Sequence, residues 1–160
     1  MDKLETYLSD HLSGSIVAID LARRRASSQG DDEIGTDLRR FAAEVERDQR
    51  TLHNVIASLG ASPSMIKELI ASGTAWVDSL RSALNLPGAP NLVRDLELLI
   101  IGVRGKELLW TALEAIGVET DPSIHDLQVR AAAQISSLEV LHARAVGQEL
   151  GPSRYPSDPG

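Results

Sequence analysis

Residues 92–116 read LVRDLELLIIGVRGKELLWTALEAI and form the most apolar run in the chain. On a helical wheel at about 100° per residue, one side of this run is a continuous apolar stripe made of Leu92, Leu96, Leu99, Ile100, Val103 and Trp110. The opposite side is also apolar, at Leu98, Ile101, Leu108, Leu109 and Ala112. Because a helix that is apolar nearly all round is buried nearly all round, we expect this segment to be a helix enclosed by other helices.

Helical periodicity also appears in segments on either side of this run. They span about residues 2–28, 32–59, 62–84 and 121–150, and the apolar run itself is the fourth helix, capped by Asn91. Glycines that follow the last periodic residue mark the ends of helices, as Gly60 and Gly117 do. Ser62-Pro63 and Asp121-Pro122 carry the start signal, in which a capping side chain precedes a proline at the first helical position.

The composition agrees with an all-α protein of one domain. The chain has 160 residues with only 3% aromatic side chains, and it shows neither the alternating apolar pattern nor the hairpin signals of strands. This length is enough for one hydrophobic core. We expect a helical bundle over residues 1–150 and a disordered tail over residues 151–160, which contain three prolines and two glycines.

Charge and residue usage exclude several classes of function. The net charge is −7, which disfavours binding to nucleic acid or to an anionic membrane surface. The absence of cysteine excludes disulfides, zinc fingers and thiol catalysis. No segment has the features of a signal peptide or of a membrane span, so we expect a cytoplasmic protein.

The lengths of the connections predict the topology. The links after the first and fourth helices are short, and short links make antiparallel neighbours. Residues 60–90 carry a shorter helix with flanking loops, long enough to cross from one end of a bundle to the other. The expected architecture is a four-helix bundle of two antiparallel pairs, joined by a helical crossover between the second and third bundle helices.

Polar groups interrupt the inward faces of three of these helices. In the second helix Asp48 lies within the apolar stripe and Glu44 at its edge. In the fourth Glu107 lies within the stripe, and in the fifth His142 lies at its centre with Glu139 three residues earlier. A buried carboxylate needs a cation, a hydrogen-bond donor or a metal, because an isolated charge in a core costs several kcal/mol.

Four long helices, a long connection after the second and an inward Glu139-x-x-His142 resemble the ferritin-like superfamily, over about residues 2–150. Within it, the pattern is closer to small bacterial ferritin-like proteins of unassigned function than to ferritin itself. In the di-iron members two helices each supply one Glu, and the other two each supply Glu-x-x-His. Such ligands suit iron or manganese.

The resemblance implies an incomplete set of metal ligands. Glu107 corresponds to the single Glu of the third bundle helix, and Glu139 and His142 correspond to the pair of the last one. Glu44 corresponds to the Glu of the second helix, with Asp48 one position beyond the expected His. The first helix lacks the inward Glu.

Two functions remain open at this point. The first is a non-enzymatic structural or interaction module that self-associates, in which cations from Lys or Arg neutralise the inward carboxylates and no cofactor is bound. The alternative is a di-metal carboxylate protein that holds iron or manganese at Glu44, Asp48, Glu107, Glu139 and His142 and acts in metal handling or oxidation. The alternative requires these five side chains to converge on one point. The chain shows no nucleophile or nucleotide-binding motif, which favours the first function.

In the structural interpretation each polar group has a partner within the protein. Glu107 then pairs with a cation such as Arg23, and His142 hydrogen-bonds the Glu three residues earlier. The two carboxylates of the second helix pair with Arg47 and Arg50 at the edge of the bundle.

Overall fold

The computed structural model describes residues 3–60 and 92–151, which form four helices and no strand. The helices are α1 (Lys3–Gln29), α2 (Glu33–Ser58), α4 (Leu92–Ala115) and α5 (Ile124–Glu149). The predicted all-α class is therefore confirmed for these residues. Within them no helix is long and apolar enough to cross a membrane. The predicted crossover helix and the predicted tail beyond Gly151 lie outside the described residues.

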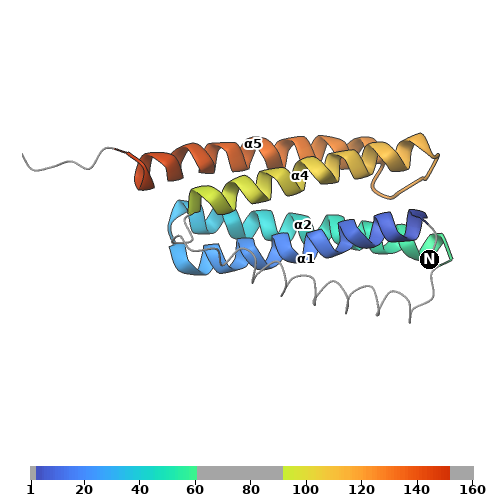
Figure 1. Ribbon diagram of the computed structural model, residues 1–160, viewed down its shortest axis with the longest axis horizontal. Helices are drawn as coiled ribbons and strands as arrows, with labels where there is room; N and C mark the ends of the chain where they lie inside the picture. Colours follow the sequence, from blue (N-terminus) through green and yellow to red (C-terminus); the bar gives the residue numbers. More distant parts are fainter. Residues whose placement is uncertain (1–2, 61–91, 152–160) are drawn as a thin grey trace, which may run out of the picture.

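The four helices form two antiparallel pairs, α1 with α2 and α4 with α5 (Figure 1). The two pairs pack on each other mainly through α1 and α4. Helices α2 and α4 run in the same direction (Figure 1).

Local capping sets where the helices begin and end. The Asp32 side chain accepts a hydrogen bond from the Gly35 N–H at 2.7 Å at the start of α2. Helix α5 begins at Ile124 rather than at Pro122, because Ser123 is its cap and accepts from the Asp126 N–H at 3.2 Å. After α4 the chain turns at Gly117, whose positive φ of 75° favours glycine.

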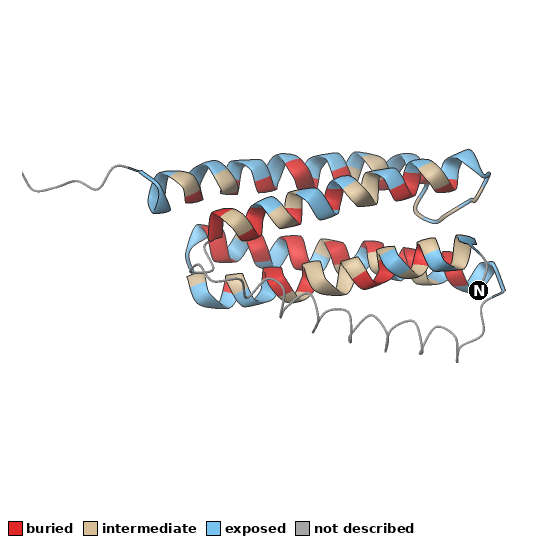
Figure 2. Cartoon of the chain, viewed as in Figure 1, coloured by how far each residue is buried: buried red, intermediate tan, exposed pale blue. Residues whose placement is uncertain are grey.

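A series of core-facing residues, spaced alternately by three and four residues as in a heptad repeat, runs along every helix. This spacing is typical of helices that pack nearly parallel to one another in bundles. Figure 2 shows the buried positions as bands on the sides of the helices that face the other pair. On α4 the series is Leu92, Leu96, Leu99, Val103, Lys106, Trp110 and Leu113, and on α5 it is Leu127, Ala131, Gln134, Leu138, Leu141 and Ala145. The same spacing connects residues 8, 12, 15, 19, 22 and 26 of α1 and residues 34, 38, 41, 45, 48, 52 and 55 of α2.

The apolar core consists of two clusters, one toward each end of the bundle. The larger cluster includes Phe41 and Leu99, and the smaller one includes Leu12 and Trp110. The expectation that α4 is buried on nearly every side is wrong. Ile101 and Leu108 are 66% and 67% exposed, because they lie on the side of α4 opposite to its heptad series.

Candidate functional site: a polar layer in the bundle core

One heptad position on each helix carries a polar residue, and these four positions lie between the two apolar clusters. They are Ser15 on α1, Asp48 on α2, Lys106 on α4 and Gln134 on α5. We refer to these four residues as the polar core layer. A polar residue at a core position of a bundle lowers stability and sets the register of the helices.

The centre of the polar core layer is the Asp48 carboxylate, of which only 2% is exposed. The Lys106 ammonium donates to Asp48 Oδ2 at 2.6 Å, and the Arg130 guanidinium donates to Asp48 Oδ1 at 2.6 Å. Gln134 Nε2 donates to the same Oδ2 at 3.2 Å. Lys106 also donates to the amide oxygen of Gln134. Both carboxylate oxygens of Asp48 are therefore held by donors from α4 and α5.

The electrostatics of the layer centre on Lys106, whose side chain is 12% exposed. Burial lowers the pKa of the Lys106 ammonium below the usual lysine value, and the Asp48 charge and hydrogen bond oppose this shift. The nearby Arg130 lowers this pKa further, whereas Glu44 raises it. The three groups in direct contact, Asp48, Lys106 and Arg130, carry one surplus positive charge.

The fourth member of the layer, Ser15, connects to α2 through a different residue. Gln49 Nε2 donates to Ser15 Oγ at 2.8 Å, and Ser15 Oγ donates to the Leu12 carbonyl oxygen at 2.6 Å. All four helices thus contribute polar side chains at the middle of the bundle, and hydrogen bonds cross from α1 to α2 and from α2 to α4 and α5.

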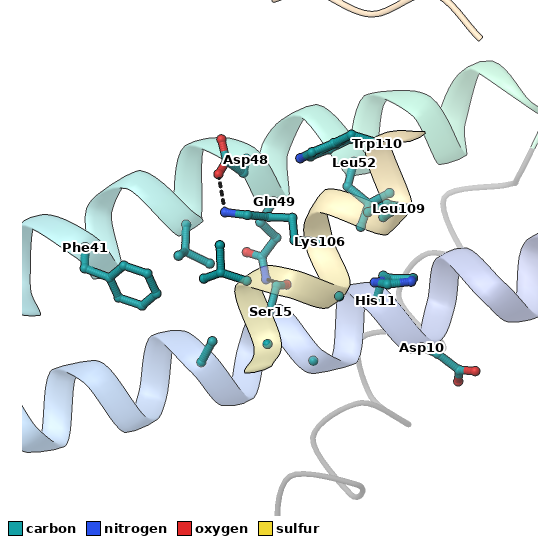
Figure 3. Close-up of a pocket in the computed structure, with 16 residues that line it drawn as sticks. Asp10, His11, Ser15, Phe41, Asp48, Gln49, Leu52, Lys106, Leu109 and Trp110 are labelled. Carbon is teal, nitrogen blue, oxygen red and sulfur yellow. Dashed lines mark hydrogen bonds and ion pairs between the residues drawn. The ribbon is translucent and has the colours of Figure 1, made fainter. Parts of the chain in front are cut away.

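A cavity of about 230 Å³ opens beside the layer, between α1, α2 and α4 (Figure 3). Its walls are largely apolar and include Phe41, Val45, Leu52 and Leu109. Glycines on the two helices that flank it, Gly14, Gly102 and Gly105, leave space that side chains would otherwise occupy. Lys106, Asp48 and Gln49 supply its polar side.

Trp110 forms one wall of this cavity and is only 1% exposed. Within residues 3–60 and 92–151, its indole Nε1–H is the buried side-chain group that has no hydrogen-bond partner. Figure 3 shows the nitrogen edge of this indole turned toward the side of the cavity where Asp48 and Lys106 meet. An unpaired buried donor costs about 1–3 kcal/mol.

The five predicted metal ligands do not come together. Asp48 is buried in the polar core layer, and Glu44 is half-buried near it. Glu107 forms an ion pair with Arg104 at 2.9 Å, and Glu139 is exposed. His142 contacts Glu97 at 3.2 Å. Glu97 precedes Glu107 by 107 − 97 = 10 residues on α4, so His142 lies about 15 Å along the bundle from Glu107.

The residues of the layer do not fit a metal. No group of three or more His, Cys, Asp or Glu side chains in the described part of the chain could hold one. Both oxygens of Asp48 already accept hydrogen bonds, from Lys106, Arg130 and Gln134. A divalent cation would have to displace an ammonium and a guanidinium from a nearly inaccessible carboxylate.

Asp48, Glu107 and His142 each have a partner within the protein, as the structural interpretation predicts, but the partners differ from the predicted ones. Asp48 pairs with cations, and they come from α4 and α5 instead of being its neighbours Arg47 and Arg50, which are exposed. Arg23, expected near Glu107, pairs with Glu46.

Sequence reasoning missed Lys106, Arg130 and Gln134, although one signal pointed to two of them. Lys106 and Gln134 continue the heptad spacing of their helices, whereas the predicted Glu107 and His142 each lie one residue out of it. One residue rotates a side chain by about 100° around a helix. This rotation moves Glu107 and His142 from the core to its edge.

Comparison of the chain with protein-family models, with curated proteins and with solved structures gives no significant match. What the chain does must therefore follow from its own geometry.

Proposed function

We propose that this chain is a ferritin-like bundle that acts as a non-enzymatic structural and interaction module, in which an internal ion-pair network occupies the middle of the bundle in place of a metal centre. The observation that carries this proposal is the Lys106 ammonium, which lies between Asp48 and Gln134. A cation of the protein therefore supplies the charge that a metal would bring. The parallel direction of α2 and α4 (Figure 1) supports the ferritin-like arrangement.

The polar core layer has a structural role in this proposal. Asp48 bonds to one side chain of α4 and two of α5, so sliding α4 or α5 by one turn would separate Asp48 from Lys106 or from Arg130. A buried charge without a partner costs about 3–5 kcal/mol. The layer therefore favours one register over the others, as single polar core residues do in coiled coils.

Metal content tests the proposal directly. The protein is produced in medium supplemented with iron and manganese, purified without chelators and measured by elemental analysis, alongside Asp48→Ala and His142→Ala. We expect well under one metal ion per chain in all three. Stoichiometric iron or manganese that is lost in either variant would overturn the proposal in favour of a metal protein.

Self-association is the second part of the proposal, and the outer face of α4 supports it. Ile101 and Leu108 lie seven residues apart on this face and are both highly exposed. Exposed apolar side chains that share a helix face favour contact with another protein surface. Light scattering coupled to size exclusion should show an oligomer that dissociates in Ile101→Glu/Leu108→Glu. A wild-type monomer at all concentrations would refute this part.

A further inference from the structure

The cavity between α1, α2 and α4 has a composition that the packing role does not require. Gly14, Gly102 and Gly105 lie within long helices, where glycine is less favourable than alanine. A Cβ on Gly14 or Gly102 would meet no heavy atom within 4 Å, and one on Gly105 would only touch His11 at 4.0 Å. Close packing between helices therefore does not account for these glycines, and their missing side chains leave the cavity open.

The cavity also presents hydrogen-bond donors that lack acceptors. An ammonium has three donors, and the structure shows two of those of Lys106 directed to Asp48 and Gln134. The Trp110 indole N–H has no acceptor among the described residues. Both side chains line the cavity, and the nitrogen edge of the indole is turned toward the Lys106 side (Figure 3). Two donors without an acceptor therefore lie on the polar side of the cavity.

We propose that this cavity binds a small amphipathic carboxylate, whose carboxylate group accepts hydrogen bonds from the Trp110 indole N–H and the Lys106 ammonium and whose apolar part lies against Phe41, Val45, Leu52 and Leu109. Arg130 and Glu44, the other charged groups that act on Lys106, do not line the cavity. Asp10 lines it, but its carboxylate is directed away from Lys106 and Trp110 (Figure 3).

The volume limits the size of the ligand. An apolar cavity of about 150 Å³ holds benzene. The larger volume of about 230 Å³ here therefore accommodates on the order of ten non-hydrogen atoms, as in octanoate.

The test uses octanoate as the probe and the indole N–H of Trp110 as the reporter. The chain has two tryptophans, Trp76 and Trp110, and Trp76→Phe assigns their two indole signals in a ¹H–¹⁵N spectrum of the full chain. We expect a saturable downfield shift of the Trp110 signal on titration, and at least ten-fold weaker binding of methyl octanoate. No shift with octanoate, or equal affinity for the ester, would overturn the proposal.

Two glycine substitutions provide a blocked variant and its matched control. Gly102 lines the cavity and Gly147 does not, and a Cβ at either would meet no heavy atom within 4 Å. Gly102→Leu should weaken octanoate binding at least ten-fold, whereas Gly147→Leu should leave it unchanged. Unchanged binding in Gly102→Leu would refute the assignment of the cavity. Metal content and oligomeric state are separate measurements, so failure of this proposal is distinguishable from failure of the proposed function.

Discussion

Replacement of Asp48 by asparagine removes the negative charge at the centre of the polar core layer and keeps the shape of the side chain. Two cations then lose their counter-charge. Arg130, which is 30% exposed, can turn toward water, but Lys106 is only 12% exposed and remains buried. Loss of one partner of a buried ion pair costs about 3–5 kcal/mol. We expect about 3 kcal/mol, the lower end, because Arg130 can relax, and a fall in Tm of about 6–12 °C for a chain of this size.

The penalty of Asp48→Asn should also decrease as pH rises. Burial already lowers the pKa of Lys106, and Asp48 is the main group that opposes this shift. Without Asp48 the folded-state pKa falls further, while the pKa in the unfolded chain is unchanged. At pH values between these two pKa values, the unfolded variant binds more protons than the folded variant. The free energy of unfolding of the variant therefore rises with pH there. The difference in free energy of unfolding between wild type and variant should therefore become smaller from pH 7 to pH 10.

Urea denaturation followed by circular dichroism at pH 7 and pH 10 measures both effects. Asp37→Asn is the matched control, because Asp37 pairs with Arg40, whose side chain is 63% exposed, and such pairs contribute about 0–1 kcal/mol. The combined variant Asp48→Leu/Lys106→Met/Gln134→Leu should be as stable as wild type or more so, since no buried charge is left alone. An Asp48→Asn penalty no larger than that of Asp37→Asn would refute the reasoning.

Five further substitutions test the packing, the turns and the caps, each by the change in free energy of unfolding. Leu12→Ala, at a fully buried position, should destabilise the fold by about 2–5 kcal/mol. Ile101→Ala, on the exposed face of α4, should change stability by less than about 0.5 kcal/mol. Similar values for the two variants would contradict the described core. Gly117→Ala should destabilise the fold by about 1 kcal/mol, because φ is positive there. Gly147→Ala should stabilise it by a comparable amount, because Gly147 lies within α5 with free space around it. A gain in stability from Gly117→Ala would contradict this turn. Ser123→Ala should cost about 0.5–2 kcal/mol through loss of the α5 cap, and an unchanged value would place the start of α5 elsewhere.

The positions of the helices could be predicted from the sequence because the signals that determine them are local. Apolar periodicity and the glycines at 60 and 117 each act within a few residues of the helix they define. The start of α5 was predicted two residues early, because Asp121-Pro122 and Ser123 are both capping signals and only the Ser123 hydroxyl reaches the backbone of the first turn.

The inward residues could be predicted only in part, since they depend on helix phase over long distances. A wheel at 100° per residue drifts by about 20° per heptad from the heptad spacing that packed helices follow. Over helices of 24 to 27 residues, this drift is enough to select Glu107 instead of Lys106 and His142 instead of Leu141. Asp48 was placed correctly in the core because the wheel and the heptad spacing agree at that position.

The amino-acid sequence alone determined that the chain is helical, where most helices begin and end, and that Asp48 needs a partner inside the core. Tertiary packing decided which partner it has. Lys106 and Arg130 are 58 and 82 residues away from Asp48 along the chain, and they meet it only when α4 and α5 pack against α2 in one register. Local propensity contains no information about such a meeting, because what selects it is the cost, in any other packing, of leaving a buried charge without its partner.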